Sequence, residues 1–428
     1  MLKTLDMINL AVLIAMTVIY GYHLVYMAVG LLGKRGKSGG PAAENRRYAA
    51  LICARNEAPV IGILVESLKA QNYPAELLDI YVLADNCTDE TARAAMSAGA
   101  VAYRRYNTEE VGKGYALDFL LKRIDRAKGL DYYDGYFVFD ADNIVDPNFV
   151  AEMNAAFCDG YDVLTSYRNS KNFASNWITY SYAVWFLREA RFINSPRMKL
   201  GNSCAVSGTG FLVASRIVQE NGGWPFHLLT EDIQFSVNCA VSGCRIGYCD
   251  SAIVYDEQPE TFKQSWTQRL RWAKGFYQVD ARYLKPLAKG VFTAKGRRMT
   301  CYDIMMTIAP GMLFSFLFLA MNIASIVVCI DAPVFIAALV MRRTVRYLAL
   351  TLIWAYAGML LLGLLTVLSE WKRIHVGALR KLIYLPVFPL FMATYIPIAL
   401  VALIAKVEWK PIQHFSRADS CVLSESKQ

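Results

Sequence analysis

Four long apolar stretches, one near the amino terminus and three near the carboxyl terminus, restrict the folds open to this chain. They cover residues 8–32, 303–330, 347–368 and 383–405. Each is long enough to cross a bilayer, because a membrane-spanning helix needs about 20 mostly apolar residues. The composition agrees, since 55% of the 428 residues are hydrophobic and 19% are charged. The pattern predicts a membrane protein with one amino-terminal and three carboxyl-terminal spans.

The first stretch is expected to be a retained transmembrane helix. It is longer than the apolar region of a signal peptide and has no small-residue cleavage pattern. A basic run at residues 34–37 follows it, which places the next segment in the cytoplasm by the positive-inside rule. The basic loop at 370–381 is expected on the same side. If the chain crosses the membrane at each predicted span, counting from the first helix puts the carboxyl-terminal tail outside the cell. A short extra crossing at 333–341 would put the tail inside, so the side of the tail stays open.

These features divide the chain into six predicted parts. They are an amino-terminal transmembrane helix (1–33), a linker (34–46), a cytosolic domain (47–285) ending in an interfacial helix (about 262–285), a basic linker (286–302), a transmembrane region (303–407) and a tail (408–428). The net charge of +9 gathers beside the apolar stretches, which favours membrane anchoring over a nucleic-acid partner. Ten scattered cysteines without a Cys-x-x-Cys pair indicate a reduced, cytosol-facing domain.

The cytosolic part alternates short apolar runs with helical patterns. The runs at 49–53, 79–84, 101–103 and 136–139 are typical of buried strands, and a helix is expected at about 60–71. Strands that alternate with helices indicate an α/β domain with a mostly parallel sheet covered on both faces.

Acidic side chains follow three of these strands. Asp140 and Asp142 end the run at 136–139, Asp85 follows the run at 79–84, and Glu57 follows the first. Ligands of open α/β sheets bind at the carboxyl ends of the strands. Two carboxylates there suit Mg²⁺ or Mn²⁺, which take oxygen ligands from carboxylates and phosphates. Ordinary turns and helix caps are the alternative.

Two further segments could carry polar chemistry. Lys113 lies between two glycines before a helical pattern, a setting that suits a phosphate or a plain surface loop. Thr230, Glu231 and Asp232 precede another helical pattern. A carboxylate there could cap the helix, or it could act as the general base that deprotonates a hydroxyl.

The segment before the carboxyl-terminal spans is rich in arginine and tryptophan. Gln268, Arg271 and Trp272 share one face of a helix by their three- and four-residue spacing, and Arg269 lies between them in sequence. Arginine binds diphosphate with two parallel hydrogen bonds, and tryptophan offers a flat face to a sugar ring. An amphipathic helix at the membrane surface is the alternative.

The motifs Asp85-Asn-Cys-Thr-Asp, Asp140-Ala-Asp142, Thr230-Glu-Asp232 and Gln268-Arg-Leu-Arg-Trp272, ahead of transmembrane helices, resemble the membrane-integrated family 2 glycosyltransferases. This group includes the cellulose, chitin and hyaluronan synthases. The resemblance implies an α/β domain of the GT-A type, Rossmann-like with a mostly parallel sheet, and an α-helical transmembrane region.

The resemblance also implies roles for the motif residues. The expected roles are nucleotide-sugar binding by Glu57, Asp85, Lys113, Asp140, Arg269 and Arg271; Mg²⁺ or Mn²⁺ binding by Asp142 and Asp140; general base catalysis by Asp232 with Glu231 orienting it; and acceptor binding by Gln268, Trp272 and Thr230. The segment at 207–211 loosely matches the acceptor-side loop of the family.

The implied activity is inverting, metal-dependent transfer from a UDP-sugar, with glucose or N-acetylglucosamine as the sugar, to a growing β-linked polysaccharide. The polymer would cross the plasma membrane, with the catalytic domain cytoplasmic. Transfer of one sugar to a membrane lipid remains an alternative, as does a transporter with an inactive domain. The sequence leaves the oligomeric state open.

Overall fold

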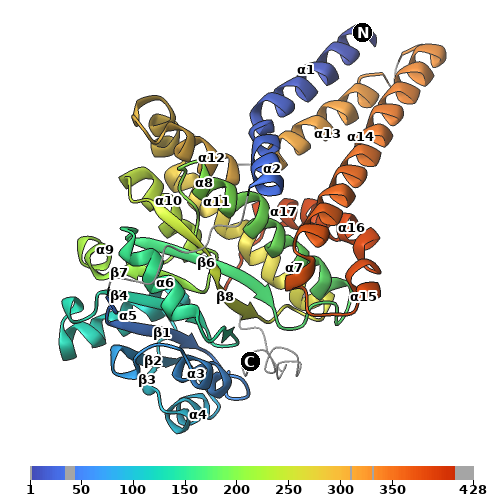
Figure 1. The fold of residues 1–428 in the computed structure, drawn as a ribbon. Helices are drawn as coiled ribbons and strands as arrows, with labels where there is room; N and C mark the ends of the chain where they lie inside the picture. Colours follow the sequence, from blue (N-terminus) through green and yellow to red (C-terminus); the bar gives the residue numbers. More distant parts are fainter. Residues whose placement is uncertain (1, 34–43, 309–310, 330–331, 410–428) are drawn as a thin grey trace.

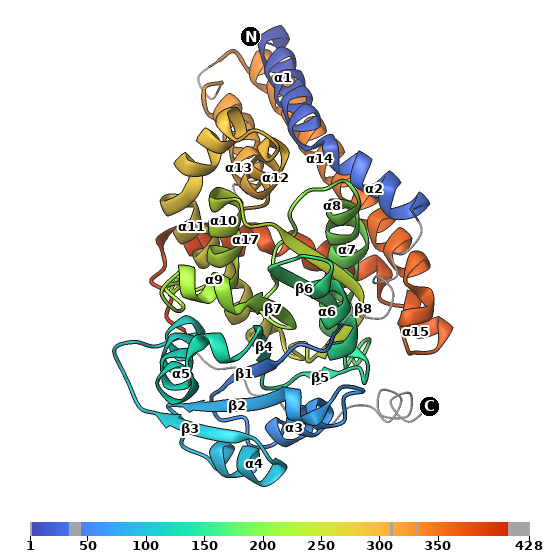
Figure 2. The same cartoon turned by 60° about the vertical axis from the view of Figure 1, so that its left-hand side comes forward.

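The computed structural model describes residues 2–33, 44–308, 311–329 and 332–409. The predicted linker at 34–46 and tail at 408–428 lie largely outside these ranges. A sheet domain flanked by helices forms one end of the molecule (Figure 1). Three helices project from it together, namely α1 (Leu2–Tyr20), α13 (Gly311–Val327) and α14 (Val334–Ser369). Figure 2 shows the same division from another side, with the strands at the bottom and the projecting helices at the top.

One sheet of eight strands forms the centre of the domain, in the order β3-β2-β1-β4-β7-β6-β8-β5. The strands are β1 (Tyr48–Ala54), β2 (Leu78–Asp85), β3 (Val101–Arg105), β4 (Gly135–Asp140), β5 (Ile144–Val145), β6 (Val163–Ser170), β7 (Phe211–Ala214) and β8 (Ile246–Asp256). The four predicted strands are confirmed as β1 to β4, which pair in parallel. The remaining half is mixed, because β7 runs antiparallel to both β4 and β6, and β5 runs antiparallel to β8.

Helices cover both faces of the sheet. Along β1, Ala49 and Leu51 belong to one apolar core, whereas Tyr48, Ala50 and Ile52 belong to the other. This alternation follows from the two-residue period of a strand. The helices of this domain are α3 (Ile61–Lys69), α4 (Thr91–Ala98), α5 (Lys113–Lys128), α6 (Phe149–Cys158), α7 (Trp177–Glu189), α8 (Ser195–Lys199), α9 (Ser215–Glu220), α10 (Glu231–Ser242) and α11 (Phe262–Thr293). The predicted helix at 60–71 is confirmed as α3.

The amino-terminal apolar stretch is not one straight helix. It forms α1 (Leu2–Tyr20) and α2 (Tyr22–Leu32), which meet at an angle of 44°. The break is at Gly21, where a Cβ atom would lie 2.7 Å from the carbonyl oxygen of Thr17. Together the two helices are apolar and long enough for one bent span.

The carboxyl-terminal region departs from the three predicted spans. The described parts of residues 303–330 belong mainly to α12 (Arg298–Ile308) and α13 (Gly311–Val327), and residues 309–310 between them lie outside the described ranges. Asp303 is fully buried and pairs with Arg197 of α8, with its Oδ2 accepting from Nε at 2.7 Å. The predicted start of this span is therefore packed inside protein.

Two segments of the described chain are long and apolar enough to cross a membrane, or three if the bent pair counts as one span. The first is α14 (Val334–Ser369), which extends the predicted span at 347–368 towards its amino end. The second, Ala378–Ile404, is interrupted and contains α15 (Ala378–Leu382), α16 (Phe388–Ala393) and α17 (Tyr395–Ile404). Part of the loop predicted at 370–381 is therefore helical.

The interfacial helix is longer than predicted, because α11 continues to Thr293 instead of ending near residue 285. The expected linker at 286–302 is consequently mostly helical. Lys274 and Tyr277 of α11 donate hydrogen bonds to the carbonyl oxygens of Ala402 and Ala399 in α17, at 3.1 and 3.2 Å. These contacts fix α17 along the domain that carries the sheet.

Candidate active site

A cavity of about 1280 Å³ opens where the carboxyl ends of β1, β2 and β4 meet α10 and α11. It brings together every predicted site residue except Arg269. The predicted residues that line it are Glu57, Asp85, Lys113, Asp140, Asp142, Thr230, Glu231, Asp232, Gln268, Arg271 and Trp272.

The register of the parallel strands explains why the acids meet. Asp140 of β4 lies opposite Cys53 of β1, and Ala54 of β1 lies opposite Ala84 of β2. The three strands therefore end at one edge, and the residues that follow them share one crevice. The structure places Asp140, Asp85 and Glu57 in this crevice, as the sequence predicts.

Asp85 is held in a buried ion pair. Its Oδ1 accepts a hydrogen bond from Nη1 of Arg105 at 2.8 Å, and the side chain is almost fully buried. Burial raises the pKa of Asp85, although the charge of Arg105 opposes this shift. One oxygen is thus engaged by the protein, and the residue closes the β2 side of the cavity.

Lys113 connects the strand-end acids to a loop from the other half of the domain. Its Nζ pairs with Oδ1 of Asp140 and donates to the carbonyl oxygen of Gly208 at 2.6 Å. Burial acts to lower the pKa of Lys113, but the negative charges of Asp140 and Glu231 raise it overall. Lys113 is the first residue of α5. The next residue, Gly114, lies so close to the carbonyl oxygen of Phe226 that a Cβ atom would be 2.0 Å from it, so glycine is needed for this contact.

The predicted base lies near the predicted metal ligand. A Cβ atom on Gly208 would lie 3.6 Å from Oδ2 of Asp232 and 3.9 Å from Oδ2 of Asp140. Gly208 has a φ of +77°, a left-handed conformation that glycine adopts without strain. The loop at Gly208 therefore turns tightly between the carboxylates of Asp140 and Asp232, and all three residues line the cavity.

Glu231 and Asp232 begin α10 and form a coupled acidic pair. Burial, followed by the negative charge of Asp232, raises the pKa of Glu231 to about 7. Burial also raises the pKa of Asp232, against the hydrogen bond from the Ile233 backbone and the charges of Lys113 and Arg271. The raised pKa of Glu231 suits a group that takes up a proton near neutral pH.

Helix α11 supplies the opposite wall. It approaches Thr230 closely at Gly275, where a Cβ atom would lie 2.5 Å from the threonine Oγ1. This approach brings Gln268, Arg271 and Trp272 to the cavity, as their shared helical face predicts. Trp272 packs edge-on against Phe186 of α7, with ring centroids 6.3 Å apart.

Arg269 points away from the cavity. Its side chain is fully buried, and its Nη1 donates to Oγ1 of Thr394 at 2.6 Å and to the carbonyl oxygen of Phe391 at 3.3 Å. The guanidinium also lies 4.1 Å from the centre of the Phe391 ring. The cause is helical geometry, because residues one and two positions apart do not face the same side. Arg269 therefore fastens α11 to α16 and its neighbour Thr394, and does not contact the expected diphosphate site.

Asp140 and Asp142 are the residues that could hold a metal ion. Asp140 keeps its Oδ2 towards the space beside Gly208, and Oδ2 of the buried Asp142 accepts from the backbone N–H of Glu257 at 3.1 Å. In the described part of the chain, no group of three histidine, cysteine or acidic residues is arranged to hold a metal. A cation here would take further ligands from a diphosphate and water, as Mg²⁺ commonly does.

A further ion pair in the cavity, Arg168–Asp256, was not predicted from the sequence. Arg168 of β6 pairs with Asp256 at the end of β8, with Nε 2.9 Å from Oδ2. Its Nη1 also donates to the carbonyl oxygen of Ser207 at 3.0 Å, which holds the loop of Gly208 in place. Asp256 and Glu257 end an apolar strand, so the strand-end signal that identified Asp140 was present here too.

The cavity continues from the acids to the projecting helices. Its far end is lined by apolar side chains of α14, α16 and α17, including Leu352, Ile353, Met359, Leu390 and Ile396. A polar end and an apolar end therefore share one cavity.

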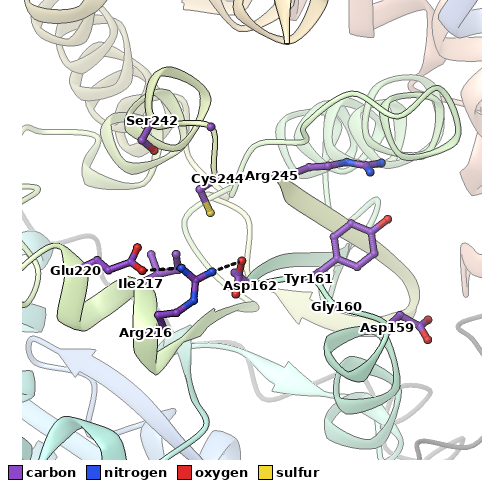
Figure 3. Close-up of a pocket in the computed structure, with 11 residues that line it drawn as sticks. Asp159, Gly160, Tyr161, Asp162, Arg216, Ile217, Glu220, Ser242, Cys244 and Arg245 are labelled. Carbon is purple, nitrogen blue, oxygen red and sulfur yellow. Dashed lines mark hydrogen bonds and ion pairs between the residues drawn. The ribbon is translucent and has the colours of Figure 1, made fainter. Parts of the chain in front are cut away.

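A smaller cavity of about 550 Å³ lies at the opposite edge of the sheet, beside the first residues of β6 and β8. Figure 3 shows Arg216 between Asp162 and Glu220 there, with ion-pair distances of 2.7 and 2.6 Å. It contains none of the predicted site residues, so the larger cavity is the candidate active site.

Comparison with known proteins shows the family to which this domain belongs. Residues 45–275, more than half of the chain, match the family described as "Glycosyltransferase like family 2". The chain is 27% identical over 241 residues to the beta-monoglucosyldiacylglycerol synthase of Synechocystis sp., covering 55% of this chain and 48% of that protein. It is 26% identical over 271 residues to the poly-beta-1,6-N-acetyl-D-glucosamine synthase of Staphylococcus aureus, covering 60% and 59%. The chain thus spans about half to three-fifths of the length of these curated relatives.

A solved structure shows the same fold. The mannosyltransferase PcManGT from Pyrobaculum calidifontis, in complex with GDP-Man and Mn²⁺, superimposes with a TM-score of 0.50 at 16% identity, covering 87% of this chain and 99% of that one. The domain therefore has the GT-A-like fold that the motifs predict. With the family match and the acidic, arginine-lined cavity at its strand ends, the chain belongs to glycosyltransferase family 2.

Proposed function

We propose that this enzyme transfers one sugar from a UDP-sugar to a hydroxyl group of a membrane lipid. The observation that carries the proposal is the single cavity that joins the acids at the strand ends to apolar side chains of α14, α16 and α17. Acyl chains suit an aliphatic wall, because burying apolar surface is favourable by about 25 cal/mol per Å². The sugar donor would occupy the acidic end and the lipid the apolar end.

The names of the curated relatives indicate glucose or N-acetylglucosamine as the sugar. The similarity to a diacylglycerol glucosyltransferase agrees with a lipid acceptor. Within the described residues, two or three segments are suitable for crossing a membrane, which is few for enclosing a polymer. We place the enzyme in the plasma membrane as a multi-pass protein with its catalytic domain in the cytoplasm.

Processive synthesis of a β-linked polysaccharide is the second candidate. It is favoured by the similarity to a poly-β-1,6-N-acetylglucosamine synthase and by Trp272, whose indole lines the cavity where a sugar ring could stack. Both candidates use the same transfer chemistry and differ in whether the product becomes the next acceptor.

In the transfer step, Asp232 takes the proton of the acceptor hydroxyl, whose oxygen attacks the anomeric carbon. The bond from that carbon to the diphosphate breaks on the opposite side, so the configuration inverts and the electron pair leaves with the diphosphate. Arg271 and Lys113 lie where they can stabilise this charge. Glu231 orients its neighbour Asp232, and Asp85 and Glu57 bind the nucleoside end.

Asp142 and Asp140 would hold Mg²⁺ or Mn²⁺. The two carboxylates fit such an ion, since their oxygens are hard ligands beside space for a diphosphate. When bound, the ion supplies Lewis-acid stabilisation of the leaving diphosphate. Lys113 shares Asp140 with this site and would turn towards the phosphates when a donor enters.

The test is to incubate the purified protein in mixed micelles with radiolabelled UDP-glucose or UDP-N-acetylglucosamine, diacylglycerol and Mn²⁺. We expect label in a chloroform-soluble product that carries one sugar. A long, water-soluble polymer that forms without added lipid would replace this proposal with the second candidate.

A further inference from the structure

Three side chains at the carboxyl end of α7 line the cavity and have no part in the transfer step. They are Trp185, Arg188 and Glu189. The same cavity contacts Phe186, which packs against Trp272, so this end of α7 shares one cavity with the catalytic acids and the apolar side chains of α14, α16 and α17. An acceptor that occupies this cavity with its hydroxyl at Asp232 can therefore meet these residues.

Arg188 and Glu189 present polar groups that the protein itself leaves available. Neither side chain has a hydrogen bond or ion pair with another residue in the part of the chain that the structure describes, and Nε of Arg188 is buried without a hydrogen-bond partner. The guanidinium carbon lies 4.5 Å from the centre of the Trp185 ring, so cation–π attraction holds it in place. An unpaired buried donor such as this Nε is costly, whereas the rest of both side chains remains partly exposed to the cavity.

The charge of Glu189 responds to Asp232 as well as to Arg188. Burial lowers the pKa of Arg188 to about 10, so it remains charged at neutral pH. Burial raises the pKa of Glu189 against the charges of Arg168 and Arg188, and the negative charge of Asp232 adds to the rise. Glu189 is therefore within electrostatic range of both Asp232 and Arg188.

The backbone next to the pair is unusual. A π-helical turn, Ala190–Asn194, follows α7 directly, and such turns are rare and often occur at functional sites. The turn is packed tightly against α2, since a Cβ atom on Gly30 would lie 2.6 Å from the ring of Phe192. The position of Arg188 and Glu189 is thus fixed by packing against the amino-terminal helix.

We infer that Trp185, Arg188 and Glu189 form a subsite for a polyol, namely the glycerol or sugar headgroup of the acceptor lipid. A hydroxyl group both donates and accepts hydrogen bonds, so adjacent hydroxyls suit an arginine that only donates beside a glutamate that accepts. The Trp185 face suits the C–H surface of the headgroup. A phosphate headgroup fits less well, because Glu189 would repel it. The inference rests on the proposed lipid acceptor.

The test compares R188A, R188K and E189Q with wild type on two acceptors, dioleoylglycerol and the same lipid bearing one β-glucose. R216A is the matched control, since Arg216 lies in the smaller cavity. We expect R188A and E189Q to raise the KM for the better acceptor about 10-fold or more, as the loss of a charged hydrogen bond implies. The KM for the UDP-sugar and its slow hydrolysis without acceptor should stay within about twofold, and R188K should recover part of the loss.

An unchanged acceptor KM in R188A and E189Q would overturn the subsite. Equal losses in acceptor use and in donor hydrolysis would also overturn it, since they indicate a structural role. Wild-type enzyme that transfers to neither lipid overturns the proposed function instead. In that case calorimetry of glucosylglycerol binding to wild type and R188A tests the subsite alone, and equal affinities would reject it.

Discussion

The two ends of the active-site cavity are built in different ways. The donor end consists of residues at the ends of neighbouring parallel strands, so Glu57, Asp85 and Asp140 recur along the sequence at intervals of 28 and 55 residues. The acceptor end is assembled from α2, α7, α11, α14, α16 and α17, which are scattered from residue 22 to residue 404. Strand order and register fix the first end, whereas helix packing decides the second.

Helix α11 places two arginines in different surroundings within one turn. Arg271 faces the cavity, and Arg269 faces α16 and Thr394. Their distance in sequence is two residues, which places them on different sides of a helix. Two neighbouring arginines of one motif thus have different physical environments, and substitutions should separate a chemical role from a structural one.

The largest expected effect is at the base. D232N should lower kcat by about 10³-fold or more, because loss of a general base costs about 10²–10⁴ in rate. The KM for the UDP-sugar should change little. The measurement is steady-state transfer of labelled sugar, with D159N as a control because Asp159 lines only the smaller cavity. Near-normal turnover of D232N would reject the assignment.

A smaller loss is expected for the arginine at the cavity. R271A should lower kcat about 10²-fold, as removal of one donor to a developing oxyanion typically does. Single-turnover rates with saturating UDP-sugar would measure the effect on the chemical step. If only the donor KM rises and kcat is unchanged, Arg271 binds the ground state and does not stabilise the leaving group.

The acidic pair should produce a pH dependence. Glu231 has a raised pKa of about 7, so it binds a proton below this pH and loses it above. We expect kcat to rise with pH and to level off above about 7, as the coupled pair becomes fully ionised. In E231Q the rising limb should move to lower pH, because a neighbouring negative charge is removed. If the rising limb of the E231Q profile stays at the wild-type pH, the pH dependence of kcat belongs to another ionisable group.

The smallest catalytic effect is expected for the arginine on the other side of α11. R269A should leave kcat per folded molecule nearly unchanged but lower thermal stability, since it removes buried hydrogen bonds that each contribute about 1–3 kcal/mol. Thermal unfolding in detergent, compared with R271A, is the measurement. A loss of kcat equal to that of R271A, without a change in unfolding temperature, would contradict the structural role.

Much of the donor end could be predicted from the sequence. Buried strands have continuous apolar runs, and acids at their ends must gather because parallel strands end at one edge. The same signal marked Asp256 after β8, and the prediction missed it because the later half of the sheet is mixed and its strands do not follow one another in space. The membrane region was predicted less well, since hydropathy does not reveal that Asp303 is neutralised by Arg197 inside the protein.

The sequence by itself determined the apolar segments, the first four strands, the acids at their ends and the helical face of Gln268, Arg271 and Trp272, because each depends on spacing along a single element. Only the tertiary structure decided that Arg269 is buried against α16, that Lys113 bridges Asp140 and Gly208, and that Arg188 and Glu189 face the cavity. These contacts join elements far apart in the chain. Their geometry is set by close packing at glycines such as Gly30 and Gly275, which no local pattern encodes.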